Sequence, residues 1–512
     1  MSITCTRCLS IALPILLVAA VSSTSEAGEP GGASKPNIVL ILIDDLGWSD
    51  VGYNGNKYYE TPNIDRLAGQ GMRFTNAYAA SQVCSPTRAS ILTGRHPARH
   101  HLTWAITYKK DDTLPAEKKL SDEPWLKLVA PGRLAGLPLE EITIAEELKK
   151  AGYATGIVGK WHLGKPPYTP ENQGFDFNFG GSYYAGPPSY FYPYKIDVIK
   201  DGVKGEFLSD RLGAEAVKFI EANRERPFFL YLSQYAVHSP YQAKPEVIDR
   251  YKKKPGAGEY FNPTFAGMVD GMDNCVGRVL VKLDELKLSD NTIVIFMSDN
   301  GGLTRSPSMG FHVTSNAPLR GGKTMIYEGG VREPMIVRWP GVAVPGSVCE
   351  DLVSTNDFFP TILAMAGLKP DPERALDGVS IVPLLKQEGG SGRDTVYWHS
   401  PHYYGGWQTS REKRTWWNTP CAAIREGDFK LIEFFEGRIE LYNLRKDIGE
   451  TRNLIKEIPD KARDLQGKLR NWLDDVDAWM PIPNPKYDPD ERGPLGRGPW
   501  SLAKSGAKKQ QK

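Results

Sequence analysis

The chain is poor in cysteine, with six in its 512 residues. Two of them, Cys5 and Cys8, lie in an N-terminal segment that we expect to be removed, which leaves Cys84, Cys275, Cys349 and Cys421. These four include no CxxC pair and no zinc-like spacing, so neither a disulfide-built scaffold nor a thiolate metal site is indicated. If Cys84 is set apart, at most one bridge can form among the other three.

Long apolar runs are also missing beyond the N-terminus. The first 27 residues contain Arg7, an apolar run from Leu9 to Val21 and small residues up to Ala27, the pattern of a secretory signal peptide cleaved after Ala27. No later run approaches the roughly 20 apolar residues of a membrane-spanning helix. We therefore expect an exported protein, periplasmic or extracellular, without stable membrane insertion.

The chain has little net charge. A formal charge of +2 argues against nucleic acid as a partner. A composition of 40% hydrophobic and 24% charged residues is ordinary for a globular protein. The length allows one large core and a smaller subdomain.

Several runs are apolar at every position and end abruptly at polar residues. They are "NIVLILIDDLGW", "RPFFLYLSQYAVHSP", "NTIVIFMSDNGG" and the shorter "PMIVRWPG". Such runs are typical of strands buried on both faces of a parallel sheet. Between them, "TPNIDRLAGQGMRF" and "TIAEELKKAGYATGIVGKWHLG" each predict a helix closed by glycine. The alternation predicts an α/β fold, a large, mixed, mostly parallel sheet with helices on both faces, and ligands beyond the carboxyl ends of the strands.

The pattern changes near Leu385. "AAIREGDFKLIEFFEGRIELYNL" predicts an antiparallel meander and "DKARDLQGKLRNWLDDV" a helix, together a small second subdomain. The last residues are rich in Pro, Gly and Lys. We predict a signal peptide over residues 1–27, a catalytic domain over 28–385, a C-terminal subdomain over 386–484 and a loose basic tail over 485–512.

Oxygen-bearing side chains follow two of the predicted strands. Asp44 and Asp45 follow one, and Asp299 and Asn300 follow another. Four such side chains at two strand ends would suit a hard cation such as calcium or magnesium better than zinc. Alternatively, each pair caps a helix or a turn. The matching contexts of the two pairs favour the metal.

Basic side chains also follow predicted strands. Lys160 and His162 stand two apart after "YATGIVG", the same-face spacing of an extended segment, His238 ends the strand "FFLYLSQYAV", and Lys323 lies in a glycine-rich turn. Each has an ordinary alternative, a structural histidine or a solvated lysine. We treat all four as candidates for the site.

Cys84 opens the stretch "CSPTRASILTGRHP". It could be half of a disulfide, a soft ligand or nucleophile, or the precursor of another group. On a helix Arg88 would share its face, Ser85 could cap and Pro86 would suit the first turn. The helix end and Arg88 would favour a bound anion, the alternative being a buried thiol and a surface arginine.

"CSPTRASILTGR" resembles the signature of the sulfatase family, formylglycine-dependent enzymes of the arylsulfatase type in the alkaline phosphatase superfamily. "ILIDDLGW", "GKWHLG", "VHSP", "SDNGG", "NAPLRGGKTMIYEGGVREP" and "ELYNLRKDIGETRNL" resemble further elements of the family, in its order. The resemblance extends from about Lys35 to about Trp479. It implies an alkaline phosphatase-like fold and hydrolysis of sulfate esters.

The resemblance implies that a maturation enzyme oxidises Cys84 to formylglycine, whose hydrate is a gem-diol. One calcium ion would then be held by residue 84 together with Asp44, Asp45, Asp299 and Asn300. The diol would attack sulfur and expel the substrate alcohol. Its second hydroxyl would later lose a proton and eject sulfate, which a serine or cysteine ester cannot do.

The remaining roles also follow from the resemblance. Arg88 would steady the diol, Lys160 and Lys323 would hold sulfate oxygens, Lys323 or His238 would protonate the leaving oxygen, and His162 would take the proton of the second hydroxyl. The resemblance also suggests Ser182 for a family position that contacts the sulfate, with a simple Gly-Ser turn as the alternative.

The expected substrates are sulfated carbohydrates, with activity on aryl sulfates as well. The aromatic and basic residues of "YWHSPHYYGGW" and "REKRTWWNTP" could stack on sugar rings or pack between subdomains. A phosphonate monoester or phosphodiester hydrolase of the same superfamily is an alternative. A non-catalytic glycan-binding protein is a further one.

Overall fold

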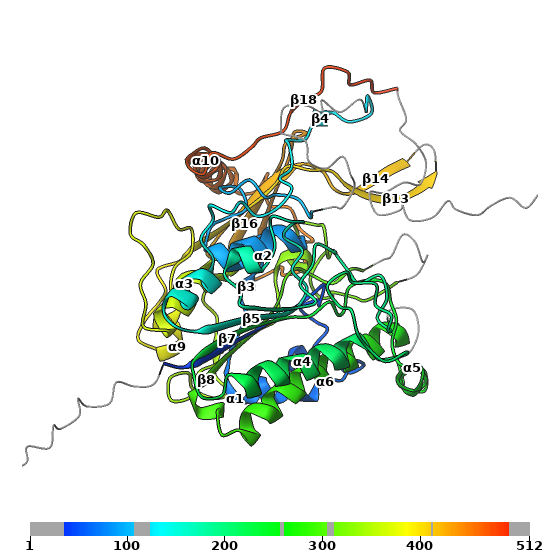
Figure 1. Ribbon diagram of the computed structural model, residues 1–512. Helices are drawn as coiled ribbons and strands as arrows, with labels where there is room; N and C mark the ends of the chain where they lie inside the picture. Colours follow the sequence, from blue (N-terminus) through cyan, green and yellow to red (C-terminus); the bar gives the residue numbers. More distant parts are fainter. Residues whose placement is uncertain (1–34, 107–122, 257–260, 305–311, 411–412, 491–512) are drawn as a thin grey trace, which may run out of the picture. The chain divides into compact units, whose positions relative to one another are not determined.

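The computed structural model describes residues 35–106, 123–256, 261–304, 312–410 and 413–490, without the side chains of residues 406–415. The predicted signal peptide and residues 491–512 of the predicted tail lie outside these ranges. Residues 35–490 belong to one compact unit, and the domain boundaries near 385 and 484 stay predictions. Figure 1 shows the described helices and strands.

An eight-stranded sheet forms the centre of the larger part of the molecule (Figure 1). Its strands, in spatial order, are β10 (Val348–Cys349), β2 (Met72–Phe74), β9 (Met335–Arg338), β8 (Thr292–Ser298), β1 (Asn37–Ile43), β7 (Phe228–Ser233), β5 (Ala154–Gly159) and β6 (Phe177–Phe179). Only the pairings of β9 with β2 and β8 are antiparallel. The sheet is therefore mixed and mostly parallel, as predicted.

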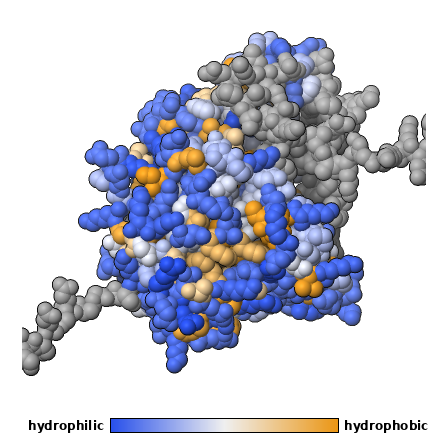
Figure 2. Space-filling view, viewed as in Figure 1, coloured by the Kyte–Doolittle hydropathy of each residue, from blue (hydrophilic) through white to orange (hydrophobic). Residues whose placement is uncertain are grey.

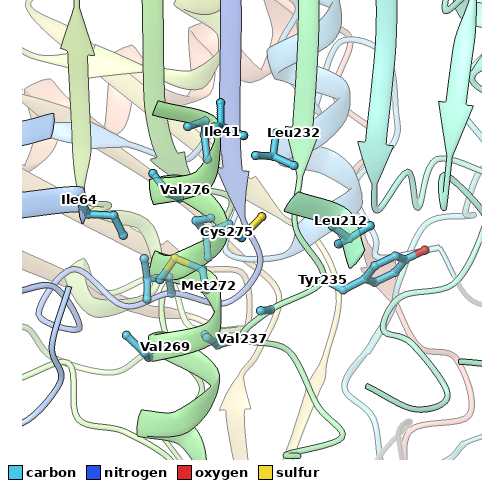
Figure 3. Packing of buried hydrophobic residues seen from close by; sticks show 14 of the residues in the cluster. Ile41, Ile64, Leu212, Leu232, Tyr235, Val237, Val269, Met272, Cys275 and Val276 are labelled. Carbon is cyan, nitrogen blue, oxygen red and sulfur yellow. The ribbon is translucent and has the colours of Figure 1, made fainter. Parts of the chain in front are cut away.

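Helices cover both faces of this sheet. One face carries α1 (Pro62–Gln70), α4 (Leu208–Ala222) and α6 (Pro263–Glu285), and the other carries α2 (Cys84–Thr93), α3 (Ile144–Lys150), α8 (Phe358–Met365) and α9 (Val382–Lys386). Along β1, Val39 and Ile41 pack on the first face, while Ile38 and Leu40 pack on the second. Figure 3 shows Met272 and Cys275 of α6 beside Ile41. The continuous apolar runs thus reflect burial on both faces.

The C-terminal part contains an antiparallel sheet of β12 (Thr395–Ser400), β15 (Cys421–Glu426), β16 (Phe429–Phe434) and β17 (Arg438–Asn443). Helix α10 (Pro459–Asp475) packs on one face, where Leu465 and Leu469 contact Ile424 and Leu431. The other face packs against the larger part through Trp398, Tyr78 and Ile326. This is the small sheet with a packed helix that the sequence predicts.

Shorter elements complete the described chain: β3 (Ala77–Tyr78), β11 (Val353–Ser354), β4 (Leu128–Val129), β18 (Ile482–Pro483), β13 (Tyr404–Ser410), β14 (Lys413–Asn418), α5 (Pro245–Lys252) and α7 (Glu328–Val331). Figure 2 shows a mostly hydrophilic face with hydrophobic side chains dispersed over it, as is usual for protein surfaces. Among the described residues, no helix is long and apolar enough to span a membrane.

Candidate active site

The four oxygen-bearing residues meet because β1 and β8 are parallel neighbours, with Ile43 aligned to Ser298. The Asp45 amide donates to Asp299 Oδ1 at 3.2 Å, and Asn300 Nδ2 donates to Asp45 Oδ1 at 2.9 Å. Parallel strands end at the same edge of a sheet, so the residues that follow them converge there. The structure therefore brings together the four predicted metal ligands.

Helix α2 begins at Cys84 and carries Arg88 one turn later. The Arg88 guanidinium is fully buried: Nε donates to Asp299 Oδ2 at 2.9 Å, and Nη2 lies 2.7 Å from the same oxygen. Burial lowers the pKa of Arg88, but Asp299 and the other neighbouring acidic groups together outweigh it, and the net pKa is raised. Arg88 is thus an internal cation, and the surface-arginine alternative is wrong.

The expected capping role of Ser85 is also wrong. The N-cap residue is Val83, and no side chain caps the helix. The Ser85 hydroxyl instead donates to the His162 carbonyl at 2.8 Å and accepts from the Ile106 amide at 3.0 Å. Ser85 therefore ties the start of α2 to two neighbouring segments.

Two buried lysines point at the aspartates. Lys160 Nζ lies 2.6 Å from Asp44 Oδ2. Lys323 Nζ lies 2.8 Å from Asp45 Oδ2 and 3.6 Å from Cys84 Sγ. Neither lysine is solvated, since they are 0% and 6% exposed. Both predicted lysines therefore belong to the same cluster as Cys84.

The two predicted histidines are buried beside this cluster. His162 Nε2 makes a hydrogen bond of 2.7 Å to the Ile106 carbonyl, while Nδ1 has no partner. His238 Nε2 lies 3.7 Å from Asp45 Oδ2. Burial lowers the pKa of His162 well below its usual value, and burial together with the charge of Lys323 lowers the pKa of His238 to about 3. Both rings are therefore neutral in this arrangement.

Two details of the local backbone differ from the prediction. Strand β7 ends at Ser233, so His238 lies in the following loop and not at a strand end. This loop crosses to β1, where the Gln234 amide donates to the Leu42 carbonyl and the Asp44 amide to the Ala236 carbonyl. His162 has a φ of 57°, so the segment from Lys160 to His162 is not simply extended.

Ser233 is a member of the site that the sequence interpretation missed. Its hydroxyl accepts from Arg88 Nη1 at 2.6 Å and donates to the Lys160 carbonyl at 2.6 Å. Serine at the end of an apolar run gives the same signal as Asp44, a polar side chain where a buried strand stops. That signal is weaker for serine because the apolar pattern resumes just after it.

Three carboxyl groups, those of Asp44, Asp45 and Asp299, face the three basic groups of Arg88, Lys160 and Lys323. Burial raises the pKa of Asp45, but Lys323 and His238 outweigh it and hold that pKa at about 2. For Asp44 burial prevails over Lys160 and raises the pKa to about 8. The site is therefore a preorganised set of buried charges that stabilises an anion and a cation together.

The residues present fit a hard cation. Buried Asp44 Oδ1 and Asn300 Oδ1 have no hydrogen-bond partner, which is costly unless a ligand binds them. Possible ligand atoms of Asp44, Asp45, Cys84 and His238 lie within 4.8 Å of one another. His238 was not among the predicted ligands. Asp299 was, but in this arrangement its two oxygens accept from the Asp45 amide and from Arg88.

Ser182 lies close to the cluster. Its carbonyl accepts from the His162 amide at 3.0 Å, and its hydroxyl donates to Asp197 Oδ1 at 2.5 Å. The hydroxyl is therefore committed to a carboxylate in this arrangement, and a contact with sulfate stays a prediction.

Several of the C-terminal aromatic residues serve packing. Tyr397 stacks on Trp472 of α10 with ring centroids 4.6 Å apart, and Trp398 meets Tyr78 edge to face. Trp398 Nε1 also donates to the Ala79 carbonyl at 2.8 Å. Trp398 therefore confirms the alternative of packing between subdomains, whereas Tyr397 packs within the C-terminal subdomain. The side chains of residues 406–415 lie outside the described part.

Comparison with known proteins identifies related sequences. The profile of the sulfatase family matches residues 36–368, and that of the C-terminal region of N-sulphoglucosamine sulphohydrolase matches residues 322–478. Human N-acetylgalactosamine-6-sulfatase is 35% identical over 80% of this chain and 77% of its own length. Human steryl-sulfatase is 31% identical over 71% of this chain and 72% of its own.

A solved structure shares the fold. Ps i-CgsB in complex with k-i-k-neocarrahexaose superposes with a TM-score of 0.69 at 31% identity, covering 89% of this chain and 95% of the other. The match includes both the central sheet and the C-terminal antiparallel sheet, in agreement with the predicted architecture.

Proposed function

The chain belongs to the sulfatase family and is a sulfuric ester hydrolase, and we propose that it desulfates carbohydrates through a formylglycine at position 84 and one calcium ion. The observation that carries this proposal is the convergence on Cys84 of two strand-end acid pairs and of buried cations. The three carboxylates are paired with Arg88, Lys160 and Lys323 in this arrangement. A sulfate ester would supply an anion for the basic groups, and the carboxylates could then hold a metal cation.

Asp44, Asp45, Asp299 and Asn300 would hold the calcium ion, with His238 nearby. When bound, the ion would supply positive charge that favours an ionised oxygen at residue 84 and neutralises a sulfate oxygen. Oxygen ligands of this kind suit calcium, and the two buried oxygens without partners support such a ligand set. Lys160 and Lys323 would then be released in part from the aspartates toward the substrate sulfate.

The environment of Cys84 supports its role as a precursor. Burial raises the pKa of its thiol to about 12, so at neutral pH the residue is a protonated thiol and not a thiolate nucleophile. The cysteine is free, as are Cys275, Cys349 and Cys421, which removes the disulfide interpretation. Oxidation to formylglycine would supply, as the hydrate, an oxygen nucleophile and a second hydroxyl. A separate maturation enzyme is the partner that this implies.

The side chains around residue 84 would divide the remaining work. Arg88 fixes Asp299 and the start of α2, so that residue 84 keeps its position. The Lys323 ammonium lies 3.6 Å from Cys84 Sγ and would protonate the leaving oxygen, whereas His238 is neutral here. His162 has a neutral ring with a free Nδ1, which suits it to accept the proton of the second hydroxyl.

Carbohydrate substrates are supported by the relatives. One is named for sulfated N-acetylgalactosamine, and another was solved with a hexaose. Export of the protein, which we also propose, would bring it to sulfated glycans outside the cytoplasm.

The test uses protein produced together with a formylglycine-generating enzyme. We expect the peptide that carries residue 84 to have the mass of formylglycine, and the protein to hydrolyse 4-nitrophenyl sulfate and members of a panel of sulfated saccharides. Phenyl phosphonate monoesters serve as the control substrate, because a preference for them would assign the chain to a different activity. Full hydrolysis by protein whose residue 84 is still an unmodified thiol would overturn the formylglycine mechanism.

A further inference from the structure

Beside the candidate active site, two aromatic rings form a stacked pair with unused polar atoms. The rings of Trp104 and Tyr404 lie 4.6 Å apart with an interplanar angle of 13°. They are 4% and 2% exposed. Among the described residues, neither Trp104 Nε1 nor the Tyr404 hydroxyl has a hydrogen-bond partner. A buried donor without a partner costs about 1–3 kcal/mol, and such groups in native proteins commonly serve a ligand.

The pair is attached directly to the reacting part of the molecule. Both rings pack on Val83, the residue before Cys84. Two residues after Trp104, the Ile106 amide donates to Ser85 and the Ile106 carbonyl accepts from His162. The pair is therefore positioned by the same backbone that positions the predicted nucleophile and base.

The electrostatic environment of Tyr404 also connects it to this site. Burial raises the pKa of the Tyr404 hydroxyl; among its neighbours, Arg133 and Lys323 lower this pKa, whereas Cys421 and Cys84 raise it. The hydroxyl therefore stays protonated at neutral pH and can both donate and accept. Cys84 is itself only 1% exposed, so the pair lies no deeper than the residue that a substrate must reach.

A cation covers the remaining face of Trp104. The Arg133 guanidinium carbon lies 3.8 Å from the centroid of the indole ring, and Tyr404 is already stacked on that ring at 4.6 Å. One face has no room for both groups, so Trp104 is held between them. Its faces are thus unavailable for stacking on a sugar, and what it can offer a ligand is the N–H at the ring edge.

We propose that Trp104 and Tyr404 form the subsite for the sugar that carries the sulfate ester, which they bind through the indole N–H and the phenol hydroxyl. Arg133 adds positive charge at this subsite and favours glycans with a second acidic group. The subsite rests on the proposed function, since it selects the alcohol part of the ester and leaves recognition of the sulfate to the cluster around residue 84.

The experiment compares Tyr404→Phe with wild type in the matured enzyme on two substrates. One is 4-nitrophenyl sulfate, which has no sugar hydroxyls, and the other is the saccharide that wild type turns over fastest in the panel. We expect kcat/KM for the saccharide to fall about tenfold, largely through KM, while the value for 4-nitrophenyl sulfate changes less than twofold. Trp104→Phe, which removes the indole N–H, should show the same selectivity. Arg133→Gln should weaken the binding of saccharides with two acidic groups more than the binding of those with one.

Tyr397→Phe is the matched control, because it removes a hydroxyl from a tyrosine stacked on Trp472 at the same 4.6 Å. It should leave both substrates unchanged. Equal losses of Tyr404→Phe on both substrates would show a structural role and overturn the subsite, as would an unchanged saccharide reaction or a wild type that hydrolyses only the aryl ester. If wild type hydrolyses no sulfate ester at all, the proposed function itself fails.

Discussion

The ammonium of Lys323 lies 3.6 Å from the Sγ of Cys84, and the same ammonium donates to Asp45 Oδ2 at 2.8 Å. The lysine comes from a loop that is remote in the chain from α2. Lys323 thereby places a proton donor between the predicted nucleophile and a predicted metal ligand. Asp45 raises the pKa of Lys323, so the group is charged at neutral pH despite its burial.

Replacement of Lys323 by methionine keeps most of the volume and removes the proton. If Lys323 protonates the leaving oxygen, kcat should fall about 100-fold or more for a sugar sulfate, whose alkoxide is a poor leaving group. The loss should be much smaller for 4-nitrophenyl sulfate, because nitrophenolate leaves without a proton. Steady-state kinetics of the matured enzyme on both substrates measure the difference.

His238→Gln is the comparison variant for this prediction. It removes the other candidate acid, which lies 3.7 Å from Asp45 and is neutral here. If His238→Gln rather than Lys323→Met shows the dependence on the leaving group, the proton comes from the histidine.

The sheet and the four oxygen ligands could be predicted because a single sequence pattern, an apolar run that ends at polar residues, indicates both. Strands buried on both faces, such as β1 and β8, have no polar positions until they end. The polar residues that follow must then lie at one edge of the sheet, whichever strands are neighbours. The convergence of Asp44 with Asp299 needed only the further fact that β1 and β8 are adjacent.

Other features depended on tertiary contacts that leave no local pattern. The apolar run after Ser233 continues to Val237, so the composition does not mark the end of β7. Ser85 has the residue type of a helix cap, yet its hydroxyl binds segments from elsewhere in the chain. The pairing of Trp104 with Tyr404 likewise depends on the packing of a loop against the start of β13, which is distant in the chain.

Removal of calcium should inactivate and destabilise the protein. Treatment with a chelator leaves the carboxylates of the site without their proposed cation. A ligand present at 100 times its Kd adds about 2.7 kcal/mol to the free energy of unfolding, and removal of calcium would forfeit a contribution of this kind. We expect the Tm to fall on chelation and to recover with added calcium. In Asp45→Asn both responses should be strongly reduced.

Asp50→Asn provides the control for the metal prediction. Asp50 is also a fully buried carboxylate, but it accepts from Thr314 Oγ1 at 2.5 Å and from the Gly47 amide at 2.9 Å. Its variant should keep the calcium dependence of wild type. A chelator response that is the same in wild type and in Asp45→Asn would contradict the proposed site.

Lys430 should be essential for stability and not for chemistry. Its Nζ lies 2.9 Å from Glu328 Oε1 and 3.1 Å from Glu450 Oε1, and all three side chains are fully buried. Lys430→Met would leave buried Glu450 without its cation, which costs about 3–5 kcal/mol in such pairs, whereas Glu328 keeps its ion pair with Arg332. Chemical denaturation should show that loss, with kcat of the folded fraction unchanged. The double variant Lys430→Met, Glu450→Gln should recover part of the lost stability. No recovery would contradict the energetic coupling between Lys430 and Glu450.

Acid should destabilise the packing of the C-terminal part, both on the larger part at His96 and internally at His399. Burial lowers the pKa of His96 and of His399 to about 4, and these rings bind the Tyr397 and Trp479 carbonyls. The unfolded chain binds these protons near pH 6.5 and the folded one only near pH 4. The contribution of these rings to the free energy of unfolding is therefore fully present above pH 6.5. It is lost as the pH falls toward 4, by about 3 kcal/mol for each ring.

The free energy of unfolding measured from pH 7 to pH 4.5 tests this prediction. His399→Gln keeps an N–H for the Trp479 carbonyl and has no titrating ring. Its stability should fall less steeply with acid than that of wild type. Parallel curves for the two proteins would assign the acid sensitivity to other groups.

Gly159 should tolerate no side chain, because it is the last residue of β5 and directly precedes Lys160. Its φ is +106°, and a Cβ there would lie 1.9 Å from the Ser233 carbonyl oxygen, which is backbone and cannot rotate away. That carbonyl accepts from the Lys160 amide at 2.6 Å. Gly159→Ala should therefore move β5 away from β7 and Lys160 away from Asp44.

Gly152→Ala is the matched control, since Gly152 has a φ of +86° with nothing within 4 Å of its Cβ. The control should lose only the roughly 1–2 kcal/mol of left-handed strain, and Gly159→Ala should lose clearly more, together with most of its activity. Equal losses in chemical denaturation would show that the close approach of β5 to Ser233 is not what fixes Lys160.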